Sequence, residues 1–174
     1  MKTFLIFCCS FFILTSCSQV KVEQKEDFVA LRRPQQLFIL PFSTVMVPNA
    51  VSEGFFDRLV DNLNQGQATT GLEFVILKQD PQVIGTKWLS EHTYVAGEIS
   101  AYVEDRGSTT VSLRAKTRLI YYAAGAAEPS LKLSYPAEVF YEKDYQTMDA
   151  ARLQLAEKIA DQLAQKLLET LAGS

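Results

Sequence analysis

Side chains that could catalyse a reaction are few in this 174-residue chain. The single histidine, His92, lies in the segment SEHTY. A histidine-rich metal site or a thiol–imidazole pair needs a further histidine or a cysteine, and no cysteine follows position 17. We therefore expect His92 to be a surface or turn residue. The alternative is an enzyme whose activity His92→Ala would abolish.

Carboxylate pairs are the other candidates for acid–base chemistry. Glu138 and Glu142 belong to a predicted strand, and Asp57 and Asp61 to a predicted helix. On exposed faces such pairs usually interact with solvent rather than act as catalytic acid and base. The sequence contains neither a GxSxG motif nor a glycine-rich phosphate loop. It thus predicts a protein that is not an enzyme and needs no cofactor or metal.

Two features could bind a partner without catalysis. Arg114, Lys116 and Arg118 alternate along a predicted strand, so their side chains project from one face. Such a row could bind a polysaccharide, a lipid headgroup or a neighbouring subunit, or it could be a solvated strand face. Trp88 lies four residues after Ile84 on a short predicted helix, where it either packs in the core or contacts the membrane interface.

The first 16 residues, MKTFLIFCCSFFILTS, have the pattern of an export signal. Lys2 precedes an apolar run that ends at Leu14, which is short of the roughly 20 residues that cross a bilayer. The segment Leu14-Thr15-Ser16-Cys17 resembles the lipobox of bacterial lipoproteins. The resemblance implies cleavage before Cys17, acylation of its sulfur with chains such as palmitate, and retention at a membrane. Ser18, rather than Asp, favours the outer membrane.

Composition agrees with export. Cys8 and Cys9 leave with the signal peptide, so the mature chain has no free thiol, which suits an oxidising compartment. It has 16 basic and 20 acidic residues, which gives no reason to expect nucleic-acid binding. We predict a lipidated N-terminus and flexible tether over residues 17–35, long enough to hold the domain about 25 Å from the bilayer. One periplasmic domain then occupies residues 36–174.

The first part of this domain has the pattern of a β-α-β unit. LFILPF (37–42) predicts a buried strand, and LEFVILK (72–78) predicts a second. The helix between them has apolar residues at helical spacing, with Asn49 as its expected cap and Gly66 as its expected end. Asp80-Pro81 predicts the start of the short helix that carries Trp88.

Three alternating segments follow, at 93–105, 110–122 and 131–141, and predict an antiparallel meander. In the first, we expect Val95, Gly97, Ile99, Ala101 and Val103 to face the same way. Pro136 predicts a bend or a sheet edge in the third segment. A long amphipathic helix, 147–171, closes the chain before Gly173. The fold class is therefore an α/β two-layer (α+β) sandwich with a mixed sheet.

The order of these elements resembles the periplasmic lipoprotein domains related to the TolB N-terminal domain. That group includes the curli-export component CsgG, the penicillin-binding-protein activator LpoB and the exopolysaccharide component PelC. The resemblance is carried by ILPF (39–42), FFDRLVDNL (55–63), LEFVIL (72–77), TYVAGEIS (93–100) and the closing helix. Lys78 stands where these domains usually have arginine, and the meander is too short for a membrane-spanning insertion like that of the curli channel.

The resemblance implies a domain without an active site that holds or activates other envelope proteins, often as a ring. We therefore predict a non-enzymatic outer-membrane lipoprotein facing the periplasm. Its partners would be an export, polysaccharide-secretion or cell-wall machine and other copies of the chain. The alternatives are an LptE-like lipopolysaccharide-assembly lipoprotein and an auxiliary lipoprotein of a lipid ABC transporter.

Overall fold

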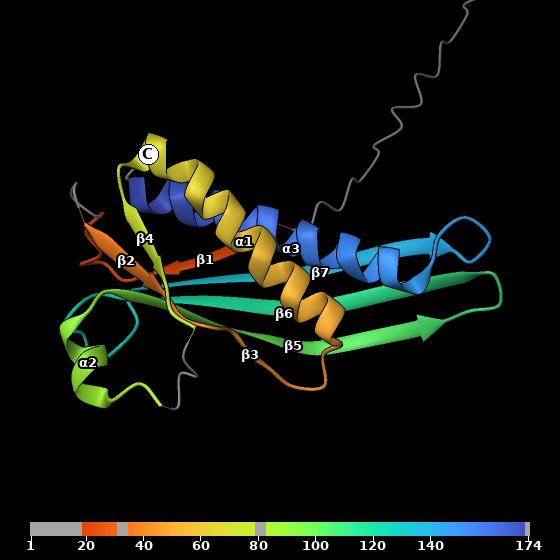
Figure 1. Cartoon of the computed structure of the whole chain (residues 1–174), viewed down its shortest axis with the longest axis horizontal. Helices are drawn as coiled ribbons and strands as arrows, with labels where there is room; N and C mark the ends of the chain where they lie inside the picture. Colours follow the sequence, from red (N-terminus) through yellow and green to blue (C-terminus); the bar gives the residue numbers. More distant parts are fainter. Residues whose placement is uncertain (1–18, 31–34, 79–82, 173–174) are drawn as a thin grey trace, which may run out of the picture.

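The computed structural model describes residues 19–30, 35–78 and 83–172. The predicted signal peptide and Cys17 lie outside these residues, as do the predicted cap Asp80-Pro81 and Gly173. In the described part, helices α1 (Asn49–Thr70) and α3 (Met148–Ala172) lie side by side over one face of a mixed sheet (Figure 1). The two-layer fold class is confirmed.

The sheet contains both parts of the predicted topology. Its strand order is β1-β7-β6-β5-β2-β4, and β3 pairs with β5. Strands β5, β6 and β7 form the antiparallel meander, whereas β2 pairs in parallel with both β4 and β5. The bounds are β1 (Lys21–Gln24), β2 (Gln36–Ile39), β3 (Ser43–Thr44), β4 (Glu73–Ile76), β5 (Tyr94–Arg106), β6 (Thr110–Tyr122) and β7 (Leu131–Glu142). The short helix α2 (Thr86–Glu91) carries Trp88 as predicted.

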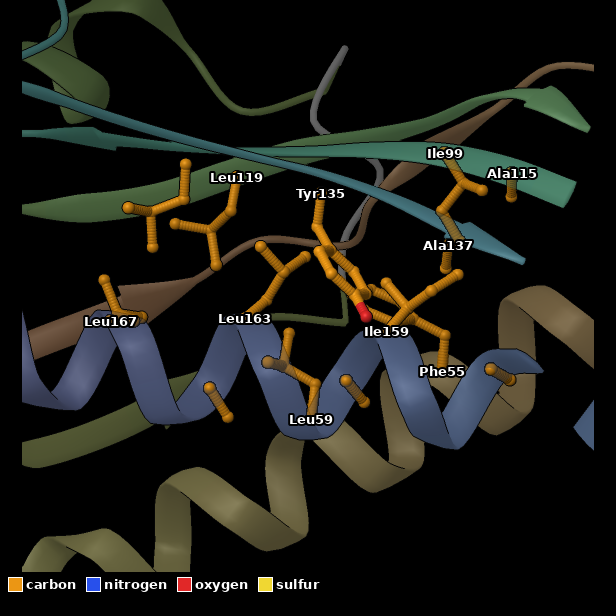
Figure 2. Close-up of a cluster of buried hydrophobic side chains, with 14 of the residues drawn as sticks. Phe55, Leu59, Ile99, Ala115, Leu119, Tyr135, Ala137, Ile159, Leu163 and Leu167 are labelled. Carbon is orange, nitrogen blue, oxygen red and sulfur yellow. The ribbon is translucent and has the colours of Figure 1, made fainter. Parts of the chain in front are cut away.

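The core lies between the two helices and the sheet. Leu155, Ile159, Leu163 and Leu167 of α3 are fully buried, as their helical spacing predicts. Figure 2 shows side chains of the sheet, such as Leu119, on the side from which α3 approaches. No long helix among the described residues covers the opposite face of the sheet, and we call it the open face.

Both predicted ends of α1 are wrong. The helix begins at Asn49 itself, because the carbonyl of Pro48 accepts the first helical hydrogen bonds and no side chain caps the turn. It continues past Gly66 and ends at Gly71, whose positive φ of 67° suits a helix C-terminus. Gly66 instead permits the close approach of α3, since a Cβ there would lie 2.4 Å from Cδ1 of Leu168.

The expected tether is wrong for residues 21–24, because they form β1. This strand pairs antiparallel with β7, with Lys21 opposite Ser134 and Gln24 opposite Leu131. Just after it, Phe28 packs edge-on against Tyr121, with ring centroids 5.8 Å apart. The folded domain therefore starts well before residue 36. Pro136 does not interrupt β7. It follows the part of β7 that pairs with β1 and therefore lies where β7 forms the edge of the sheet, as one of the two predicted alternatives requires.

The alternation expected for β5 fails in its second half. Ala101 adopts a positive φ of 50°, and the pairing with β6 shifts between Ser100 and Val103. This β-bulge reverses the side chains that follow it. Val103, expected on the core side, is 43% exposed, while Tyr102 packs against the core.

The bulge creates an ion cluster between β5 and α3. Oε1 of Glu104 accepts hydrogen bonds from Nη2 of Arg152 at 2.5 Å and from the hydroxyl of Tyr102 at 2.8 Å. Its Oε2 accepts one from Arg106 at 2.7 Å. Burial alone raises the pKa of Glu104, but these hydrogen bonds outweigh it and lower the pKa to about 2. The cluster joins the β5–β6 hairpin to the start of α3.

We expect Glu104→Gln to destabilise the domain by about 2 kcal/mol, the usual worth of a hydrogen bond to a charged group. Because the folded pKa of about 2 lies below the ordinary value of 4.5, Glu104 stabilises the domain fully above pH 4.5. That contribution is lost as the pH falls towards 2. Urea unfolding at pH 7 and at steps below pH 4.5 measures both effects. Equal acid sensitivity in the two proteins would contradict the assignment.

Candidate functional surface

The basic row lies on the open face, as its period predicts. Arg114, Lys116 and Arg118 are exposed along β6, while Leu113, Ala115 and Thr117 between them are buried. This arrangement follows from strand geometry, since only one face of β6 is covered by α1 and α3. The structure therefore presents the three cations together to solvent.

Carboxylates on the neighbouring strands partly neutralise the row. Nη2 of Arg118 lies 2.9 Å from Oε1 of Glu98 on β5. Arg114 is 3.8 Å from Glu138 on β7 and 4.0 Å from Asp105 on β5. Among the described residues, no carboxylate lies within ion-pair distance of Lys116. Exposed ion pairs contribute only about 0–1 kcal/mol, so the two arginines can exchange their carboxylates for an anionic partner.

Trp88 packs at one end of the same sheet face. Its ring lies edge-on against Phe38 of β2, with centroids 5.0 Å apart, and stacks on His92 at 4.2 Å. Phe38 points to the open face, because Leu37 and Ile39 on either side are buried in the core. Nδ1 of His92 donates to the carbonyl of Trp88 at 2.8 Å, since a carbonyl can only accept. Trp88 is thus half-buried, and His92 serves to pack α2.

The open face also carries exposed apolar side chains that the sequence analysis did not single out. Phe140 of β7 is 68% exposed, and Val103 of β5 is turned outward by the bulge. They line a shallow hollow of about 620 Å³ together with Arg114, Lys116 and Pro136. Alternation along β7 could have indicated Phe140, whereas no local signal indicated the bulge that exposes Val103.

Further exposed apolar side chains precede α1 and α3 or lie in their early turns. The two helices touch near their starts, since a Cβ on Gly54 would lie 2.9 Å from Cδ1 of Leu153. Met46 is 92% exposed with a positive φ of 56°, and Tyr145 is 86% exposed. We call the set Val45, Met46, Tyr145 and Leu153 the helix-start surface. The apolar run VMV in a predicted loop was the signal available for it.

Two kinds of feature are absent from the residues that the structure describes. No helix there is both long and apolar enough to cross a membrane. No group of histidine, cysteine, aspartate and glutamate side chains there could hold a metal ion.

The fold is similar to that of PelC. The PelC dodecamer from Paraburkholderia phytofirmans superposes with a TM-score of 0.56 and 8% identity, over 85% of this chain and 98% of the PelC chain. The hypothetical protein CT253 from Chlamydia trachomatis gives a TM-score of 0.57 and 10% identity, over 80% of this chain and 98% of that chain. The sequence matches no family model and no curated relative. This chain therefore has a PelC-like fold.

Proposed function

We propose that this protein is a non-enzymatic outer-membrane lipoprotein, anchored through Cys17, that assembles in the periplasm with an export or cell-wall machine. The PelC-like fold is the observation that carries the proposal, since it covers 85% of the chain, and the segment before it resembles a lipobox. PelC itself is a dodecamer, which supports assembly of this chain with further copies or with a partner.

The helix-start surface is our candidate for the contact with that partner. Exposed apolar clusters on soluble proteins often mark interaction sites. Met46 combines nearly full exposure with a strained positive φ, and such strain in a non-glycine residue often accompanies a functional role. Leu153 lies beside Gly54 of α1, Val45 and Met46 precede α1, and Tyr145 precedes α3.

Photo-crosslinking in cells tests this assignment. We expect a benzophenone amino acid at Met46 or Tyr145 to give discrete adducts severalfold above those at Asn64, an exposed position later on α1. All three side chains are exposed, so the substitutions should not disturb the core. Adducts at multiples of the chain mass would identify a homo-oligomer, and a β-barrel partner would favour the LptE-like alternative. Equal labelling at all three positions would contradict the assignment.

A further inference from the structure

Strand β1 limits how far the domain can lie from its predicted lipid anchor. Only Ser18, Gln19 and Val20 separate Cys17 from Lys21, the first residue of β1. Four Cα–Cα steps span at most about 14 Å. Pairing with β7 fixes β1 to the sheet, so these few residues are the whole connection. If Cys17 is acylated, the domain lies against the membrane rather than at the end of a long tether.

The described chain begins beside the basic row. Gln19 lines a hollow of about 310 Å³ together with Lys21, Lys116, Arg118 and Pro136. Lys21 pairs in register with Ser134, and Ser134 pairs with Arg118, so the three strands bring these cations to one level of the sheet. Gln19, two residues after Cys17 in the sequence, therefore lies next to cations of the open face.

Gln19 lies between two surfaces, the open face and the flank of α3, and these surfaces differ in charge. On the α3 side, Lys166 is paired with Glu169 at 3.2 Å, and the other neighbours are uncharged. On the open face, Glu23 pairs with Lys21 at 2.7 Å and Glu98 with Arg118 at 2.9 Å, which leaves the charge of Lys116. Of these two described surfaces around Gln19, the open face therefore carries the more positive charge.

Apolar side chains on the open face continue this surface. Phe140 and Val103 are exposed close to Arg114 and Lys116, in the hollow described above. Exposed aromatic and aliphatic groups among cations are typical of surfaces that lie at the headgroup level of a bilayer. Each cation near an anionic leaflet contributes about 1 kcal/mol. The acyl chains would provide the affinity, and the basic row would set the orientation.

We propose that the open face, around Lys21, Lys116, Arg118 and Phe140, rests on the anionic phospholipid headgroups of the membrane that holds Cys17. This inference rests on the proposed lipidation. The alternative to this inference is that the basic row is a solvated strand face that binds no partner.

Lipid quenching on the lipidated full-length protein tests the orientation. The predicted mature chain has no thiol besides Cys17, so one introduced cysteine can carry a bimane label. Ser134→Cys labels the open face and keeps every cation, while Asn64→Cys labels the exposed side of α1 as the control. In vesicles of phosphatidylglycerol and brominated phosphatidylcholine, we expect severalfold stronger quenching at position 134 than at position 64.

Charge reversal and flotation complete the test. Lys21→Glu, Lys116→Glu and Arg118→Glu together should lower quenching at position 134 severalfold, and these side chains are exposed enough for the fold to remain. Protein that floats with vesicles but is quenched equally at both positions would overturn the inference. Equal quenching with an oligomer on crosslinking would assign the row to another copy. Protein that does not float would refute the lipidation itself.

Discussion

Gly97→Ala is expected to destabilise the domain by about 3 kcal/mol, at the upper end of the range for overpacked cores. Gly97 lies on β5 between Val95 and Ile99 and faces the helical layer. A Cβ at this position would lie 2.1 Å from Cε1 of Phe42 and 2.6 Å from the carbonyl oxygen of Arg118. The ring of Phe42 cannot move freely, because it packs edge-on against Phe55 at 4.9 Å. The carbonyl belongs to the paired strand β6, so relief would require the sheet to open.

Thermal unfolding checks this result, with Gly85→Ala as the matched control. Apart from the two flanking residues, no atom of the described residues lies within 4 Å of a Cβ built on Gly85, so the same substitution there should change little. For a domain of this size, about 3 kcal/mol corresponds to a loss of roughly 6–12 °C in Tm. If both variants have the same Tm, Phe42 does not occupy the space above Gly97, and the packing of the segment between β2 and β3 onto α1 would need revision.

Regular elements with one covered face were predictable from the sequence. On β6, Leu113 and Leu119 are buried while Arg114 and Arg118 are exposed, because strand side chains alternate and only one face meets the helices. The stripe of α3 was predictable for the same reason, since Leu155 and Leu163 recur with the helical period. The basic row was found through this alternation.

Features that depend on distant partners were not predictable. Gly66 and Gly71 carry the same local signal for a helix end, and only the contact of Gly66 with Leu168 on α3 distinguishes them. The polar sequence KVEQ (21–24) becomes a strand because the edge of β7 is available to pair with it. The bulge at Ala101 has no glycine to indicate it.

The same reason limits what could be predicted of the candidate surface. The pairing of Arg118 with Glu98 depends on the register between β5 and β6. The position of Lys21 beside the basic row depends on the unexpected strand β1. Residue types and their spacing in the sequence identified the cations. Only the fold shows which of them have carboxylate partners, and that Lys116 and Arg118 lie beside Gln19 at the start of the described chain.

Cys17→Ala is expected to remove the protein from the membrane or to leave its signal peptide uncleaved. The two results differ in mass, so fractionation followed by intact-mass measurement separates them. Wild-type protein should lack residues 1–16 and carry acyl chains on Cys17. Cys9→Ala is the matched control, because it removes a cysteine that is predicted to leave with the signal peptide. It should be processed and retained like the wild type.

The open face alone cannot replace the anchor. Three cations at about 1 kcal/mol each give roughly 3 kcal/mol, which corresponds to dissociation constants in the millimolar range. Acyl chains contribute about 0.8 kcal/mol for each buried methylene, so two or more chains hold durably. Residual binding of processed Cys17→Ala should therefore be weak and disappear at high salt. Salt-resistant binding after normal cleavage would show that a different part of the chain anchors the protein, and the lipobox prediction would be wrong.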